Sequence, residues 1–141
     1  MHAVIETSRG TIAFRFQAKD APKTCENFVK LVKQGFYDNL TWHRVVADFV
    51  IQAGCPKGDG TGGPGYSIDA EFSELEHVKG TVAMARKQAL NSAGSQFYIA
   101  RKALPQLDKQ YTVFGQVTSG FDVVDKIKQG DAIKKISIVE E

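Results

Sequence analysis

The stretch from Trp42 to Gly63, WHRVVADFVIQAGCPKGDGTGG, constrains the fold more than any other part of the chain. Its two runs 42–46 and 49–53 are mostly aromatic, β-branched or aliphatic, and Ala47 and Asp48 separate them. This pattern predicts a tight pair of strands. Alternate side chains of a strand point to the same face. With the register still open, the pair can gather three side chains near one surface: Arg44, Phe49 and Gln52.

The residues before this stretch predict a hairpin and a helix. Residues 2–7 and 11–16 alternate as two strands around a turn at residues 8–10. Pro22 suits the first position of a helix, apolar residues then recur at helical spacing, and Gly35 supplies the end. We therefore predict a helix over residues 22–34.

The residues after it begin with a glycine-rich segment. Residues 54–65 contain six glycines and two prolines, too many for the interior of a helix or strand, so an ordered loop or a mobile lid is predicted. A second helix is expected to begin at Ser119 or Gly120 and to extend through Ile127, with Asp122 early and lysines late, as suits the helix dipole. Further strands are predicted at 80–84, 96–100, 111–117 and 134–139.

Five motifs resemble those of the cyclophilin-type peptidyl-prolyl cis-trans isomerases. The first begins with histidine and arginine, has a phenylalanine five positions after the arginine, and ends in glutamine and glycine. Each motif alone is weak, but five in order with compatible spacing make the resemblance specific over nearly the whole chain. The motifs are HRVVADFVIQAG (43–54), GTGG (60–63), GTVAMA (80–85), NSAGSQFYIA (91–100) and LDKQYTVFGQV (107–117).

The resemblance implies a fold that composition alone does not specify. It implies a mainly β protein, a closed antiparallel eight-stranded barrel capped by two α-helices. At 141 residues a single domain over residues 1–141 is expected, large enough to bury roughly two thirds of its unfolded surface.

The resemblance also implies catalysis of rotation about Xaa-Pro bonds. Arg44 is assigned the catalytic hydrogen bond, with Gln52 and Phe49 beside it. A guanidinium stays charged and presents a rigid fork of donors, which suits a transition state whose imide nitrogen regains a lone pair. The alternative is a proline-peptide binding module with little turnover, and retention of all three residues favours the enzyme. Taken alone, Arg44 would more often form a surface salt bridge, and the apolar residues would more often be core.

Further site residues are carried over from the family motifs. His43 and Phe97 are expected behind the site, with Phe97 turned toward the core. The peptide is expected to lie along Ala85 and Arg86 as an added strand. The resemblance also implies that the glycine-rich loop at 54–65 borders the substrate groove. The substrate-binding residues implied are Val50, Ala85, Arg86, Gln96, Tyr98, Leu107 and Tyr111.

Five positions depart from the best-known family pattern. Val50 replaces methionine, Arg86 replaces asparagine and adds charge beside the groove, and Tyr98 replaces phenylalanine and adds a hydroxyl. Gln106 replaces the tryptophan of cyclosporin-sensitive members, and Tyr111 replaces histidine. Weak cyclosporin binding is therefore expected, with isomerase activity retained.

Other functional classes find little support in the residues. The net charge of +2 and the scattered lysines do not suggest a nucleic-acid partner, and no apolar run is long enough to span a membrane. The GDGTGG segment lacks the GK[ST] ending of a phosphate-binding loop. No histidine or cysteine pair has the spacing of metal ligands, and no GxSxG elbow is present. No cofactor and no metal are expected.

The expected setting follows from the same reading. No secretory signal is recognised at the N-terminus, so a cytoplasmic protein is expected, with Cys25 and Cys55 as free thiols. The partners expected are proline-containing peptides and unfolded or flexible protein segments, which would make the protein a folding helper. A monomer is the expected state.

Overall fold

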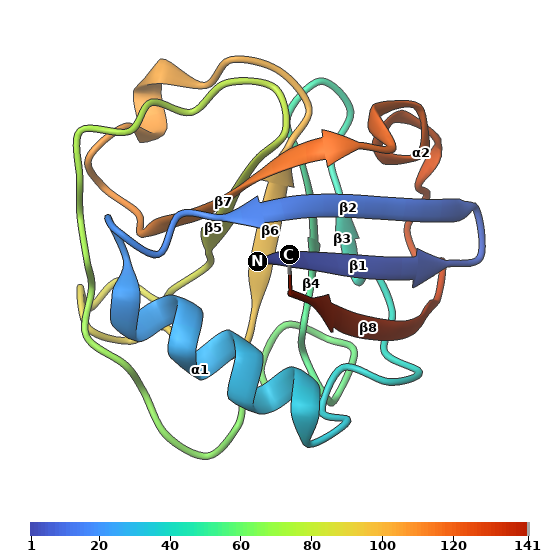
Figure 1. The fold of residues 1–141 in the computed structure, drawn as a ribbon, viewed down its shortest axis with the longest axis horizontal. Coiled ribbons are helices and arrows are strands. Elements are labelled where there is room, and N and C mark those ends of the chain that lie inside the picture. The colour runs from blue at the N-terminus through green and yellow to red at the C-terminus, as the bar shows by residue number, and fades with distance from the viewer. Residues whose placement is uncertain (141) are drawn as a thin grey trace.

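The structure is a computed structural model that describes residues 1–140. One antiparallel sheet of eight strands forms its body, in the spatial order β3-β4-β6-β5-β7-β2-β1-β8, and Figure 1 shows the sheet wrapping around the interior. The strands are β1 (His2–Thr7), β2 (Gly10–Phe16), β3 (Arg44–Val45), β4 (Val50–Ala53), β5 (Thr81–Met84), β6 (Phe97–Ala100), β7 (Val113–Ser119) and β8 (Ile133–Val139).

Two helices accompany the sheet, as predicted. Helix α1 (Pro22–Lys33) begins with proline in its first turn, and Gly35, with a φ of 73°, follows its end, where a left-handed residue commonly stops a helix. Helix α1 packs against β8, and α2 (Phe121–Lys126) packs against β2. A 3₁₀ turn, η1 (Pro105–Leu107), was not predicted.

The prediction of a closed barrel is wrong, because the sheet is an open half-barrel. Strands β3 and β8 form its two edges and do not pair with each other. Among the described residues, an isolated bridge between Thr41 and Ala132 connects the two sides. There the backbone N–H of Trp42 donates to Asp131 (2.9 Å) and that of Ile133 donates to Leu40 (2.7 Å). The chain thus meets the far edge just before β3 begins, and the two-residue β3 does not continue the ladder.

The main core lies between the sheet and α1. Phe28 of α1 is 1% exposed and contacts the rings of Phe14, Tyr37, Phe97 and Phe114 at centroid distances of 4.9–5.7 Å. Such edge and offset ring pairs stabilise a core beyond the area they bury.

A second, smaller apolar cluster lies on the other side of β4, β5 and β6. It is built from Val50, Ala83, Tyr98, Ala100, Leu104 and Val113. Because neighbouring strand residues point to opposite faces, β6 sends Phe97 into the main core and Tyr98 into this cluster. The predicted core position of Phe97 is therefore confirmed. Both cysteines are buried free thiols, which agrees with the prediction.

Candidate active site

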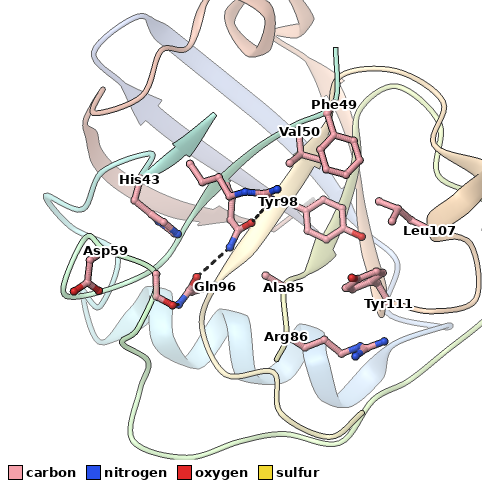
Figure 2. Close-up of a pocket in the computed structure, with 13 residues that line it drawn as sticks. His43, Phe49, Val50, Asp59, Ala85, Arg86, Gln96, Tyr98, Leu107 and Tyr111 are labelled. Carbon is pink, nitrogen blue, oxygen red and sulfur yellow. Dashed lines mark hydrogen bonds between the residues drawn. The ribbon is translucent and has the colours of Figure 1, made fainter. Parts of the chain in front are cut away.

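A pocket of about 550 Å³ opens over the second cluster. Figure 2 shows that its labelled side chains come from β4, β6, the 3₁₀ turn η1 and the loops between the strands. Every residue predicted as catalytic or substrate-binding lines it, together with His43, whereas Phe97 does not. Asp59 and Gly60 also line it; neither was named as a site residue, although the family resemblance placed their loop beside the groove. The lining residues are His43, Arg44, Phe49, Val50, Gln52, Asp59, Gly60, Ala85, Arg86, Gln96, Tyr98, Leu107 and Tyr111.

Arg44 is placed by the register of the β3–β4 hairpin. It stands directly opposite Gln52, across a turn at Asp48, which has a left-handed φ of 56°. Its Nη1 donates to Oε1 of Gln52 over 3.3 Å, and its guanidinium carbon lies 5.8 Å from the centre of the Phe49 ring. An exposed arginine is thereby held over the rim of the pocket by one amide and one aromatic face.

A chain of amides continues from Gln52 to the glycine-rich loop. Gln52 Nε2 donates to Gln96 Oε1 (3.1 Å), and Gln96 Nε2 donates to the carbonyls of Gly60 and Gly62 (both 2.9 Å). Gln96 thus ties the predicted loop to the sheet at the pocket edge. The orientation of Arg44 depends on three side chains and a loop, and not on β3 alone.

The loop folds back against itself at Asp59. The Asp59 carboxylate accepts from the hydroxyl (2.6 Å) and backbone N–H (2.9 Å) of Thr61. These bonds hold the pKa of Asp59 below its ordinary value. The DGT sequence is typical of such an aspartate turn, so this signal could have pointed to the fold of the loop.

His43 lies between this loop and Arg44. Burial lowers its pKa, and the neighbouring Arg44 acts in the same direction, while a hydrogen bond with Gln96 opposes them. A neutral imidazole beside the guanidinium adds no competing positive charge to the pocket.

The apolar wall of the pocket is formed by residues of different exposure. Val50 and Tyr98 are 2% and 4% exposed and form its floor. Phe49, Leu107 and Tyr111 are half-buried and pack against that floor. The Tyr98 and Tyr111 rings meet edge to face at 5.7 Å. The wall is therefore a preformed concave apolar surface, of the kind that small rings enter.

Arg86 does not extend into the pocket as a free charge. Its guanidinium donates to the carbonyls of Gln110 (2.8 and 3.1 Å), Lys87 (3.0 Å) and Gln88 (3.2 Å) and lies 4.8 Å from the centre of the Tyr111 ring. It fastens the segment after β5 to the segment before β7. Ala85 beside it donates its backbone N–H to the Gln96 carbonyl (3.0 Å).

Behind Tyr98 lie two polar residues that sequence reasoning missed. His77 Nε2 is 2.7 Å from the Tyr98 hydroxyl, and His77 Nδ1 is 3.0 Å from Asp108 Oδ1. Neither residue lines the pocket. No spacing rule links positions 77, 98 and 108, because the contacts arise only in the fold.

Two further structural findings concern metal sites and membrane spans. Within residues 1–140, no group of three or more His, Cys, Asp or Glu side chains is arranged to hold a metal ion. Across that part of the chain, no helix is long and apolar enough to cross a membrane.

Comparisons with known proteins identify the class to which this fold and pocket belong. The model of the family "Cyclophilin type peptidyl-prolyl cis-trans isomerase/CLD" matches residues 2–140. The chain therefore belongs to the cyclophilin-type peptidyl-prolyl cis-trans isomerases, and its function is prolyl isomerisation.

Individual relatives agree with this assignment. A peptidyl-prolyl cis-trans isomerase of Helicobacter pylori is 48% identical over 96% of this chain and 85% of its own length. One of Synechococcus elongatus is 46% identical over 99% of this chain and 97% of its own length. A Cryptosporidium parvum cyclophilin crystallised in the presence of the dipeptide Ala-Pro is 32% identical, with a TM-score of 0.93 and full coverage of both chains.

Proposed function

We propose that the pocket accelerates cis-trans rotation by binding the proline ring on its apolar wall and stabilising the twisted amide through Arg44. The observation that carries this proposal is the position of the Arg44 guanidinium, over the Phe49 ring at the rim of the apolar hollow. A proline ring seated on Val50 and Tyr98 would place its imide nitrogen near that guanidinium.

The physical basis is the loss of amide resonance during rotation. The barrier of about 18–20 kcal/mol arises because the twisted amide loses its partial double bond. Its nitrogen then becomes pyramidal and regains a lone pair that the planar forms lack. A hydrogen bond to that lone pair forms only in the transition state, so it raises the turnover rate without tightening substrate binding.

The magnitude available from one such bond is substantial. A hydrogen bond to a charged group contributes about 1.5–3 kcal/mol, which corresponds to roughly 10- to 150-fold in rate. Gln52 and Gln96 serve this bond by limiting the directions in which Arg44 can point.

The substrate class follows from the open rim of the pocket. Proline-containing peptides and flexible protein segments can lie along Ala85 and the start of the following loop while one proline occupies the hollow. The Cryptosporidium parvum relative, crystallised in the presence of Ala-Pro, supports this binding mode. Weak cyclosporin binding, a monomeric state and a cytoplasmic location stay predictions.

The test measures the cis-to-trans rate of an Ala-Pro peptide with the intact protein, with Arg44→Ala, and with Arg9→Ala as a matched control. Arg9 is a surface arginine that pairs with Asp131 away from the pocket. We expect a large acceleration that Arg44→Ala abolishes and Arg9→Ala preserves. Peptide binding by the intact protein without acceleration would make it a proline-recognition module instead.

A further inference from the structure

Three polar side chains form a series beneath the proline pocket. The Tyr98 hydroxyl contacts His77 Nε2 at 2.7 Å, and His77 Nδ1 contacts Asp108 Oδ1 at 3.0 Å. His77 is 1% exposed and Tyr98 4% exposed, and their rings are stacked with an interplanar angle of 14°. The series begins in the pocket floor and ends at Asp108, the chain neighbour of the pocket residue Leu107.

The direction of the hydrogen bonds can be derived from Asp108. Its carboxylate accepts from the backbone N–H of His77 (2.7 Å), and this bond contributes most to holding its pKa below the ordinary value. An ionised carboxylate only accepts hydrogen bonds, so the proton of His77 must be on Nδ1. Nε2 is then the acceptor, and the Tyr98 hydroxyl donates to it.

This arrangement uses the only proton that Tyr98 could offer to a substrate. Burial raises the pKa of Tyr98 and lowers that of His77, so both stay neutral and the donor-acceptor pair is retained. The phenol thus adds no free donor to the apolar hollow, and its ring is fixed at the hydroxyl end as well as at the backbone.

The same series also fixes the segment that carries Leu107 and Tyr111. Asp108 attaches one end of that segment to His77. Arg86 attaches the other end through the Gln110 carbonyl. The floor and one side of the pocket are thereby connected to each other by hydrogen bonds.

We propose that His77 and Asp108 are positioning residues for the proline pocket, acting through the Tyr98 hydroxyl to hold the ring on which proline rests. This inference builds on the proposed role of the pocket. If His77 only fills the interior, the effect of changing Asp108 on peptide binding should not depend on the Tyr98 hydroxyl.

The experiment combines the variants Asp108→Asn and Tyr98→Phe in a double-mutant cycle. Tyr98→Phe removes the hydroxyl and keeps the ring, and the exposed ion-pair residue Asp125 provides the matched control Asp125→Asn. KM and kcat for an Ala-Pro peptide are measured for each variant, with Kd from calorimetry in parallel. Urea unfolding confirms that each variant is folded.

We expect Asp108→Asn to raise KM and Kd about three- to tenfold, the difference between a hydrogen bond to a charged and to a neutral acceptor, with kcat within about twofold. In the Tyr98→Phe background the same change should have almost no effect, and Asp125→Asn should have none in either. An equal effect of Asp108→Asn in both backgrounds would overturn the proposal, as would no effect in either.

Nitrogen NMR of His77 provides a readout independent of turnover. The proposal requires the tautomer with the proton on Nδ1, and detection of the Nε2–H tautomer in the intact protein would refute it. If the intact protein binds the peptide without turnover, the proposed catalytic role of Arg44 fails, while Kd and the tautomer still decide the role of His77 and Asp108.

Discussion

Phe97 and Phe49 offer a direct test of how the fold separates stability from binding. Phe97 is fully buried and its ring lies 5.4 Å from Phe28, 5.6 Å from Tyr37 and 5.9 Å from Trp42. Replacing a buried phenylalanine by alanine costs about 3–5 kcal/mol through reduced burial and the cavity left behind. Because three aromatic rings pack against Phe97, Phe97→Ala should fall in the upper half of that range.

This cost is large compared with the total stability of a domain, about 5–15 kcal/mol. Phe97→Ala should therefore leave a folded but fragile protein, or unfold it. Phe49 is half-buried at the pocket rim, and its truncation should cost less than about 1.5 kcal/mol. Phe49→Ala should instead weaken peptide binding, because the ring forms part of the pocket wall.

The assay is urea unfolding followed by far-UV circular dichroism, with Ala-Pro peptide binding measured on the same samples. We expect a lower unfolding midpoint for Phe97→Ala and weaker peptide binding for Phe49→Ala. The reasoning would be refuted if Phe97→Ala kept its stability within about 1 kcal/mol while losing peptide binding, because its ring would then belong to the pocket.

Three further perturbations follow from individual contacts. Gln96→Leu should lower kcat/KM about tenfold, because the orientation of Arg44 loosens. It should cost little stability, because water can reach the freed carbonyls. Kinetic measurements on Gln96→Leu and on the control variant Gln106→Leu test this. Burial lowers the pKa of His77, so the unfolded chain binds more protons and stability should fall as pH drops below about 6.5. Urea unfolding at several pH values tests this, and stability should depend less steeply on pH in His77→Gln. Gly54→Ala should cost more than about 2 kcal/mol, because its Cβ would lie 2.4 Å from the Ser95 carbonyl oxygen at a φ of +97°; thermal unfolding tests this.

Each has an outcome that would contradict it. Unchanged kcat/KM in Gln96→Leu would show that Arg44 is oriented without the amide chain. His43 also has a lowered pKa, so His77→Gln should reduce the pH slope without abolishing it, and an unchanged slope would contradict the role given to His77. A Cβ added at Gly63 would meet no atom within 4 Å, and Gly63 has no left-handed φ. Gly63→Ala should therefore be nearly neutral, and equal losses of stability at both glycines would contradict the close-approach argument.

Local patterns predicted the elements of this fold better than their closure. The hairpin of β1 and β2, the start of α1 at Pro22 and the pair β3–β4 agree with the sequence patterns, because turn residues and alternation act over a few neighbours. Whether β3 meets β8 depends on residues far apart in the chain, and no local signal carries that information. The family resemblance supplied the barrel, and the structure shows it open.

The sequence likewise predicted some residues of the candidate site and not others. The motifs named Arg44, Gln52 and Gln96 as site residues, and the structure brings all three to one pocket, since motif positions carry the geometry of the family with them. They assigned no role to His77, which contacts the hydroxyl of Tyr98, or to Asp108, which contacts His77. A contact made by a residue that departs from the family pattern lies outside what that pattern can predict.

Tyr98 and Arg86 both depart from the family pattern, and the protein satisfies the hydrogen-bond donors of both in the same way. Each adds a strong donor beside an apolar hollow, and an unpaired donor there would be costly to bury. The Tyr98 hydroxyl is bound to His77, and the Arg86 guanidinium is bound to three backbone carbonyls and to the face of Tyr111. Both donors are thus satisfied by the protein itself, so the pocket keeps its apolar wall for proline. Arg44 differs because its guanidinium, held by Gln52 through one amino group, stands at the open rim, where the proposed mechanism requires a donor for the rotating imide nitrogen.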